Sequence, residues 1–461
     1  MRTMMLSELA LCCEGRLIGA DVAIENISID GREAMPQGLF VALKGERFDA
    51  HDFVAQAKVN GAVALLLHRM IETDLPHILC ADTEEALGEM AAGLAKDRPA
   101  VVLALTGSNG KTSVKTMLHS ILLSAGDVYV NPGNRNNEIG LPLAVINAPE
   151  NAEFAVYEMG AGKLGDIAYL TSIVTPNVAL VNNVAPAHIE RMGSLLGIAE
   201  TKGAIYEALP DDGVAVVNVD DAFLPYFLDR IGSRCIIRFG IKNNADVMAK
   251  SMVLSAEQSQ FELVTPAGSA KITLAFPGIH NVMNALAATA MALSAGASFE
   301  AILAGLSNAR PFAGRQVVMP LANGALLIDD SYNANPGSVI AAIDSLALAC
   351  ALDKKISVLV LGDMAELGEA AESLHAQIGL VAKSRGIQLL YACGRLSRAA
   401  CNSFGEGATH FNSQLELIET ITKQLAPQHR VLVKGSRSSQ MDQVVNALIN
   451  AVGLKEGSDA S

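Results

Sequence analysis

The strongest constraint on the fold is a glycine-rich loop that joins an apolar stretch to an amphipathic one. Residues 106–112 run Thr-Gly-Ser-Asn-Gly-Lys-Thr; the stretch 101–105 before them is apolar, and the pattern 113–123 after them is helical. A strand that passes through such a loop into a helix is typical of a nucleotide-binding α/β fold. The glycines let backbone N–H groups converge on an anion, and the helix N-terminus adds a positive dipole. The segment therefore predicts a phosphate site.

The chemistry of this loop indicates a nucleoside triphosphate. Lys111 can reach a terminal phosphate, and the hydroxyl of Thr112 can hold Mg²⁺. The full Walker spacing is broken because Leu105 stands where its first glycine belongs, so a plain strand-to-helix turn is the alternative. The Gly-Lys-Thr opening of the helix favours ATP and Mg²⁺ as cofactors. The predicted ATP ligands here are Gly107, Ser108, Asn109, Gly110, Lys111, Thr112 and Ser113.

Length and pattern predict three α/β domains. A chain of 461 residues is too long for one core, since domains usually hold roughly 100 to 200 residues. Polar links near 96–99 and 308–314 place the domains at 1–98, 99–312 and 313–461. The first is a small α/β unit. In the other two, strands alternate with helices, which indicates a central parallel sheet and a C-terminal Rossmann-like domain.

The expected strands recur at regular intervals. In the central domain they are 154–157, 178–181 and 214–217, with helices at 163–171 and 195–209; in the last domain they are 325–328, 357–361, 388–392 and 431–433. The span 231–279 has alternating runs instead and predicts a local antiparallel addition. Two nucleotide-type folds in tandem suggest a shared ligand cleft.

Composition narrows the class of protein. The formal charge of −14 disfavours a nucleic-acid surface. Seven cysteines, without a C-x-x-C pair or zinc-like histidine spacing, indicate reduced thiols of a cytosolic protein. There is no A-x-A-like cleavage site, and no apolar run approaches the ~18 residues of a membrane span. We expect a cytoplasmic monomer without membrane insertion.

Polar side chains follow successive strands of the predicted central sheet. Glu158 ends the strand at 154–157, and His188 follows the next one along the chain. Since parallel strands end at the same edge of a sheet, both should lie beside the phosphate loop, where a Mg²⁺ ligand belongs. A lone histidine more often has a structural role, but the expected nearness of the phosphate loop and Glu158 favours a functional role for His188. Lys202 lies within the helix at 195–209, and its pattern alone indicates a solvated surface residue.

Other polar runs have a structural alternative beside the functional one. The loop 131–140 packs amides, glycines and a carboxylate, which either cap turns or line a site. The segment 278–284 opens a helix, which His280 or Asn281 could simply cap. In the last domain, polar runs such as 329–336 collect at strand ends and predict a second ligand edge.

Together these segments resemble the Mur ligase family over nearly the whole chain. The runs Asp330-Ser331-Tyr332-Asn333-Ala334-Asn335-Pro336, Gly362-Asp363-Met364 and Lys434-Gly435-Ser436-Arg437 are similar to the branch that adds a D-alanyl-D-alanine dipeptide. The segments 30–32, 39–46 and 48–53 resemble the family's UDP-binding domain. Gly31 stands where the family commonly has serine, and Asp442 where glutamate is usual.

The resemblance implies an ATP-dependent amide ligase. The terminal carboxylate of UDP-N-acetylmuramoyl-tripeptide would attack the γ-phosphate of ATP to form an acyl phosphate. The amine of D-alanyl-D-alanine would then attack the acyl carbon, giving the pentapeptide precursor of peptidoglycan with ADP and phosphate. Lys111 and Mg²⁺ would offset the charge on the transferred group.

The resemblance also implies individual roles. Lys202 would carry a carbamate that bridges Mg²⁺, in contrast to its surface pattern. Thr112 and Glu158 would hold one Mg²⁺, and His188 with the modified Lys202 a second. The expected catalytic residues are Lys111, Glu158, His188 and Lys202. Expected nucleotide contacts are Asn281 and Asn284 to adenine, Arg315 to the γ-phosphate and Asp330 to the ribose. The residues expected at the two other substrates are Asp30, Arg32, Lys44, Asn134, Asn136, Asn137, Tyr332, Asn333 and Asn335.

Two other functions are possible for a chain with this phosphate loop, and each can be distinguished from the Mur-type ligase. A folylpolyglutamate synthase-like ligase shares the activation chemistry but would not be expected to carry the run 332–336 or the N-terminal UDP-type domain. An ATP-hydrolysing switch leaves three separate ligand edges unexplained. It would release phosphate without acceptor and amine, whereas a ligase needs both.

Overall fold

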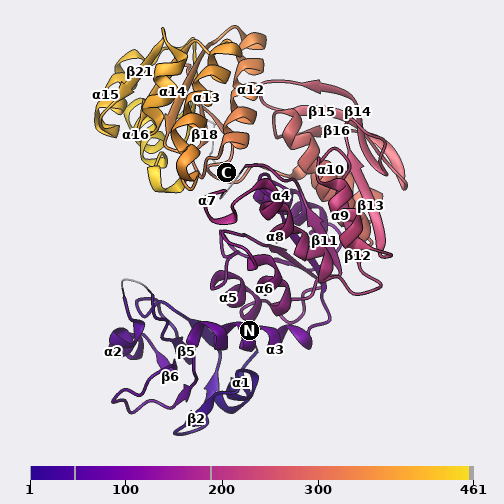
Figure 1. The fold of residues 1–461 in the computed structure, drawn as a ribbon, viewed down its shortest axis with the longest axis vertical. Helices are drawn as coiled ribbons and strands as arrows, with labels where there is room; N and C mark the ends of the chain where they lie inside the picture. Colours follow the sequence, from indigo (N-terminus) through magenta and orange to yellow (C-terminus); the bar gives the residue numbers. More distant parts are fainter. Residues whose placement is uncertain (1, 46–47, 187–188, 456–461) are drawn as a thin grey trace.

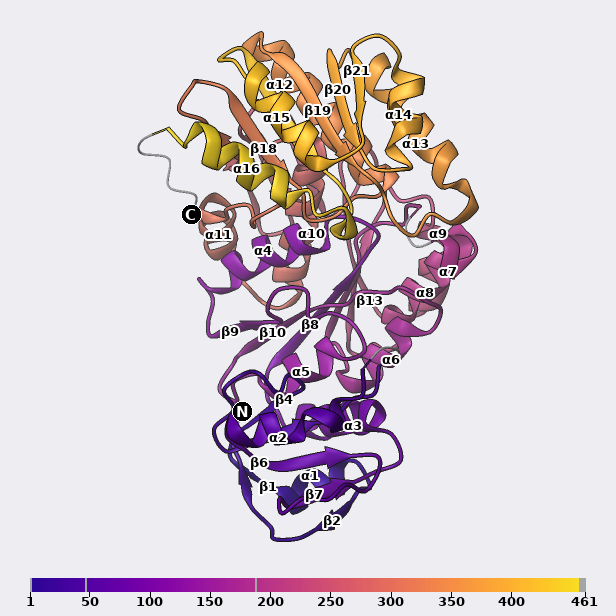
Figure 2. The same ribbon diagram turned by 90° about the vertical axis from the view of Figure 1, so that its left-hand side faces the viewer.

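The protein consists of three sheet-based units that follow one another along its long axis (Figures 1 and 2). The structure, a computed structural model, describes residues 2–45, 48–186 and 189–455. The expected α/β class with three successive units is confirmed.

The N-terminal unit is built on a five-stranded sheet of order β2-β7-β6-β5-β4, with a separate β1-β3 pair. Its long helix α3 is capped at the N-terminus by Asp82, whose side chain accepts hydrogen bonds from the backbone N–H groups of Glu84 and Glu85. The elements are β1 (Met4–Met5), α1 (Leu6–Cys12), β2 (Arg16–Ile18), β3 (Ala23–Ile24), β4 (Asn26–Ser28), β5 (Gly38–Val41), η1 (Ala50–Phe53), α2 (Val54–Val59), β6 (Ala62–Leu67), β7 (His77–Leu79) and α3 (Thr83–Lys96).

The central unit holds a nine-stranded sheet of order β16-β15-β14-β13-β12-β11-β8-β10-β9. The strands from β9 to β14 pair in parallel, and β14, β15 and β16 pair antiparallel, which confirms the predicted antiparallel addition. The elements are β8 (Val101–Thr106), α4 (Lys111–Leu122), β9 (Val128–Val130), α5 (Gly140–Ile146), β10 (Phe154–Glu158), α6 (Asp166–Ile173), β11 (Val178–Val181), α7 (Ile189–Met192), α8 (Leu195–Glu207), β12 (Val214–Asn218), α9 (Leu224–Ile231), β13 (Cys235–Gly240), β14 (Val247–Leu254), β15 (Ser259–Thr265), β16 (Gly268–Leu274), α10 (Ile279–Ser294) and α11 (Phe299–Asn308).

Strand β8 lies at the switch point of this sheet, because the chain crosses to β10 on one side and to β11 on the other. Ligands of open α/β sheets bind in the crevice beyond the carboxyl ends of strands at such a point. The apolar strands are covered on one face by α4 and the alanine-rich α10. On the other face the core continues into the N-terminal unit, whose α3 packs against α5 and α6.

The C-terminal unit carries a six-stranded sheet of order β17-β18-β22-β19-β20-β21, parallel except for β17. Helix α12 is the one described helix that is long and apolar enough to cross a membrane, yet it buries one side against this sheet. The elements are β17 (Val317–Pro320), β18 (Leu326–Asp330), α12 (Pro336–Asp353), β19 (Ile356–Gly362), η2 (Gly368–Ala370), α13 (Ala371–Ser384), β20 (Leu389–Cys393), α14 (Ser397–Phe404), β21 (Ala408–Phe411), α15 (Gln414–Gln424), β22 (His429–Lys434), η3 (Arg437–Ser439) and α16 (Asp442–Val452).

Candidate active site

The glycine-rich loop lies at the carboxyl end of β8, where α4 begins at Lys111. Gly110 has a φ of +80°, and a Cβ there would lie 2.3 Å from Asn284 Oδ1, so only glycine fits. The loop is tied to the end of β11: Ser108 N donates to Asn183 O at 3.0 Å, and Asn109 N donates to Asn183 Oδ1 at 2.9 Å. Its backbone is thereby fixed before any anion arrives.

Three buried asparagines, Asn182, Asn284 and Asn281, form a chain of hydrogen bonds that ends on the loop. Asn182 Nδ2 donates to Asn109 O at 2.9 Å and to Asn284 Oδ1 at 3.0 Å, and Asn284 Nδ2 donates to Asn281 Oδ1 at 3.2 Å. The side chain of Asn281 donates to Pro277 O at 2.8 Å, and the cap position before helix α10 is held by Gly278, not by His280 or Asn281. The capping alternative is therefore wrong for these residues. Sequence analysis missed Asn182 and Asn183, although both follow an apolar strand directly.

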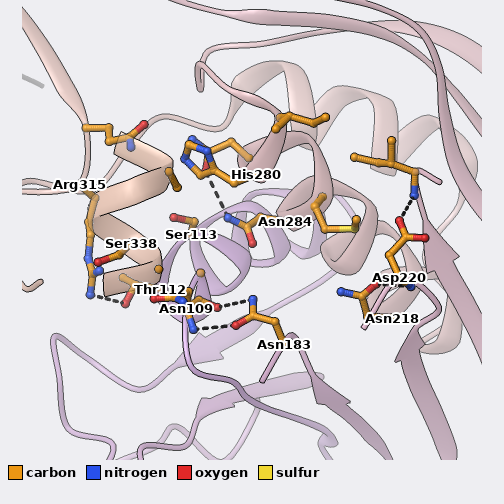
Figure 3. A pocket seen from close by; sticks show the side chains of 18 of the residues that line it. Asn109, Thr112, Ser113, Asn183, Asn218, Asp220, His280, Asn284, Arg315 and Ser338 are labelled. Carbon is orange, nitrogen blue, oxygen red and sulfur yellow. Dashed lines mark hydrogen bonds between the residues drawn. The ribbon is translucent and has the colours of Figure 1, made fainter. Parts of the chain in front are cut away.

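A cavity of about 440 Å³ opens beside this loop, between the central and C-terminal units. Figure 3 shows Asn109, Thr112, His280, Asn284 and Arg315 around it. The predicted nucleotide residues that line it are Asn109, Gly110, Thr112, Ser113, Asn281, Asn284, Arg315 and Asp330. Lining residues to which no role was assigned include Asn183, Asn218, Asp220, His280, Gln316, Ser338 and Lys434. One cavity thus joins the ligand edges of two sheets.

The C-terminal unit contacts the phosphate loop directly. Arg315 Nη2 lies 3.4 Å from Thr112 Oγ1, and its guanidinium stacks 4.2 Å above the ring of Tyr332. Asn335 Nδ2 donates to Asn109 Oδ1 at 2.8 Å. Arg315 Nε is buried without a hydrogen-bond partner among the described residues. A preformed donor left unpaired beside the cavity is suited to an incoming phosphate.

Asp330 and Lys434 form a buried ion pair at the ends of β18 and β22. Lys434 Nζ donates to Asp330 Oδ2 at 2.7 Å and to Asn333 O at 2.9 Å. Burial lowers the pKa of Lys434, while the neighbouring carboxylate opposes the shift. The Asn333 side chain accepts from the N–H of Ala334 and so shapes its own turn. The pair fixes the edge that carries Asp330 toward the cavity.

The end of β10 carries the candidate metal ligand Glu158, which is 3% exposed. Its Oε1 accepts a hydrogen bond from Asn136 Nδ2 at 2.9 Å, whereas its Oε2 has no hydrogen-bond partner among the described residues and lies 3.4 Å from the ammonium of Lys115. Buried oxygens of this kind suit Mg²⁺, which prefers carboxylate and hydroxyl ligands. Glu158 and Thr112 therefore offer oxygen atoms of the kind that Mg²⁺ binds. His188, the expected ligand of the second ion, lies outside the described residues.

Two lysines, Lys111 and Lys202, lie close enough for the charge of one to affect the other. Lys111 is half-buried and donates to Gly107 O at 2.8 Å, and burial lowers its pKa against the opposing effect of Glu158. Lys202 is 2% exposed, so its interpretation as a surface residue is wrong. Helix α8 is enclosed by β11, α6 and α9, and a Cβ at Gly203 would lie only 3.2 Å from Arg230 Cδ. Burial first, and the nearby Lys111 charge second, lower the pKa of Lys202 to about 7.

The lowered pKa of Lys202 predicts a pH dependence of stability. Between about pH 7 and 10.5 the unfolded chain binds a proton that the folded chain does not, so stability should rise with pH across this window. Lys202→Met removes this dependence and should stabilise the protein near pH 7 by about 1–4 kcal/mol. Thermal unfolding in EDTA and CO₂-free buffer checks this; parallel pH curves for the two proteins would contradict it.

A second cavity, of about 560 Å³, lies between the N-terminal unit and the loop that follows β9. Asp30 lines it together with Asn134, Asn136 and Asn137. Asn136 also donates a hydrogen bond to Glu158, which itself lines neither of the two cavities. Arg32 and Lys44 do not line it: both are exposed, and Arg32 pairs with Asp30 at 2.6 Å, which helps to keep the pKa of that carboxyl at about 2.

Comparison with known proteins gives a consistent match along the chain. Three family models cover residues 23–101 (Mur ligase family, catalytic domain), 105–292 (Mur ligase middle domain) and 314–437 (Mur ligase, glutamate ligase domain). The chain is 44% identical to the UDP-N-acetylmuramoyl-tripeptide--D-alanyl-D-alanine ligase of Escherichia coli (strain K12), over 97% of this chain and 99% of that protein. It is 33% identical to the enzyme of the same name from Bacillus subtilis (strain 168), over 93% and 94%.

Solved structures agree. The chain superposes on MurF from Acinetobacter baumannii with a TM-score of 0.91 at 35% identity, covering 97% of this chain and 99% of that one. MurF ligase from Thermotoga maritima in complex with ADP gives a TM-score of 0.82 at 26% identity, over 93% and 97%.

Proposed function

This chain belongs to the Mur ligase family, and on that basis we propose that it joins D-alanyl-D-alanine to UDP-N-acetylmuramoyl-tripeptide at the expense of ATP. The observation that carries the proposal is a pair of cavities, each of which the central unit shares with a neighbouring unit. One holds the phosphate loop and the residues suited to a nucleotide, and the other lies against the N-terminal unit. Glu158 is hydrogen-bonded to Asn136 of the second cavity, and in this proposal the acceptor carboxylate meets the γ-phosphate beside it.

The residues of this chain suit activation of a carboxylate. Amide formation from a carboxylate and an amine is uphill in water, so the acceptor is first converted to an acyl phosphate. Lys111 of the phosphate loop and Arg315, which approaches Thr112 from the C-terminal unit, would supply positive charge where negative charge spreads during phosphoryl transfer. The amine of the dipeptide then attacks the acyl carbon and phosphate leaves.

Magnesium belongs to the proposal through the chemistry of its ligands. Thr112 and Glu158 would hold one ion, and His188 with a carbamylated Lys202 a second. The ion, when bound, neutralises charge on the phosphates. A lysine with a pKa of about 7 is largely neutral at slightly alkaline pH, which carbamate formation requires. Contacts between the C-terminal unit and the phosphate loop keep water from the reactive acyl group.

The substrate residues keep the roles that the family resemblance implies. We assign Asp30, Asn134, Asn136 and Asn137 to UDP-N-acetylmuramoyl-tripeptide. Tyr332 stacks with Arg315 and Asn335 contacts Asn109, and we assign both to the dipeptide. The protein acts as a monomer in this proposal.

Phosphate release tests the function. With ATP, Mg²⁺ and UDP-N-acetylmuramoyl-tripeptide, we expect release only when D-alanyl-D-alanine is added, and a product whose mass equals that of the pentapeptide precursor. Release that is indifferent to both substrates would indicate an ATP-hydrolysing switch instead.

A further inference from the structure

Lys115 is a buried lysine to which the reaction assigns no role. It lies one turn after Lys111 on α4 and is 6% exposed. Its ammonium donates to Asn131 O and to Gly133 O, both at 3.0 Å, and lies 3.4 Å from Glu158 Oε2. A buried ammonium is costly unless oxygens surround it. Here the oxygens come from two other segments of the chain.

Those segments are the acceptor loop (residues 131–138) and the end of β10. Asn131 joins them, because its Oδ1 accepts from Glu158 N at 2.9 Å and its Nδ2 donates to Glu158 O at 3.0 Å. Asn136, farther along the loop, donates to Glu158 Oε1. The acceptor loop and Glu158 are thus joined by hydrogen bonds. Lys115 connects both of them to α4, the helix that begins at the phosphate loop.

We propose that Lys115 is a positioning residue that holds the acceptor loop and the Glu158 carboxylate in register with the phosphate loop. This rests on the proposed function, since the acceptor loop lines the cavity assigned to UDP-N-acetylmuramoyl-tripeptide. Lys115 acts through Asn131, Gly133 and Glu158 and does not itself line either cavity. Its loss should therefore weaken acceptor binding while the phosphate loop, which is held by Asn182 and Asn183, stays in place.

The substitution Lys115→Met removes the donors and keeps most of the side-chain volume. We expect its affinity for UDP-N-acetylmuramoyl-tripeptide to fall by about 10- to 100-fold, the range for loss of a group that orients a ligand-binding side chain. Its affinity for ADP without Mg²⁺ should stay within about twofold. Isothermal titration calorimetry measures both constants on the full chain without relying on turnover.

Ser120→Ala is the matched control on the same helix. Its hydroxyl donates to Gly305 O at 2.8 Å and secures α4 against α11, away from both cavities. This variant should lose some thermal stability and change neither affinity. If Lys115→Met does not fold, Lys115→Gln carries the test, because its amide keeps a donor without the charge.

Two results would overturn the proposal: unchanged acceptor affinity in a folded Lys115 variant, or an equal loss of acceptor and ADP affinity, which would indicate general disruption of α4. Failure of the proposed function itself is a separate observation, since the unmodified protein would then fail to bind UDP-N-acetylmuramoyl-tripeptide.

Discussion

Replacing Lys111 with alanine is expected to lower kcat by about 10³-fold or more, because a cation over the transferring phosphoryl group contributes on that scale. The fold should remain intact. The side chain is half-buried, and its hydrogen bond is to Gly107 O within its own loop, so it contributes charge rather than packing. Phosphate release and the thermal unfolding temperature, measured on the same preparation, check both parts.

The control for this prediction is Lys271→Ala. Lys271 is an exposed lysine on β16, far along the sheet from the phosphate loop, and its loss removes the same formal charge. It should leave turnover unchanged. Normal turnover by Lys111→Ala would refute the role of this lysine, and a large fall in unfolding temperature would show that it serves the fold.

Lys202→Ala should also be inactive, with a loss of about 10²- to 10³-fold, the scale on which one group that stabilises developing charge contributes. If the lysine acts as a carbamate, a short carboxylic acid placed in the space left by the substitution can supply the missing oxygens. We therefore expect acetate or formate to restore part of the activity in a concentration-dependent way.

Lys111→Ala serves as the control for rescue, because a carboxylic acid cannot replace a cation. Acids should restore Lys202→Ala and leave Lys111→Ala inactive. An inactive Lys202→Ala that no acid restores would count against the carbamate and leave Lys202 as a buried amine beside Lys111.

Much of the central unit could be predicted from local sequence. Its strands are short apolar runs buried on both faces, and a polar residue (Glu158, Asn182 or Asn218) follows each run, so the strands at 154–157, 178–181 and 214–217 were predicted to within one residue. The phosphate loop could be found for the same reason. Its function depends on backbone N–H groups, and only a narrow set of residues allows that geometry.

Residues that act through tertiary contact were harder to predict. Lys202 has polar and small neighbours typical of a solvated helix face, and only the packing of α8 between the sheet and α9 buries it. Asn183 contacts the phosphate loop although more than 70 residues separate them, because β11 lies beside β8 in the sheet. Lys115 resembles an ordinary helix lysine until the acceptor loop folds over it. Local periodicity carries no information about which strand becomes the neighbour.

Asn335 has two tasks, since it contacts the phosphate loop and also caps α12 by accepting a hydrogen bond from Ser338 N. The amino-terminal ends of α12 and α4 thereby converge on one cavity, which Ser338 and Thr112 both line. In a protein of net charge −14, long-range attraction would not bring a polyanion to its site. Two helix N-termini at one cavity instead create a positive potential over a few ångströms. The nucleotide is therefore captured at short range, and the positive potential is greatest when the helix ends of the two units stand together.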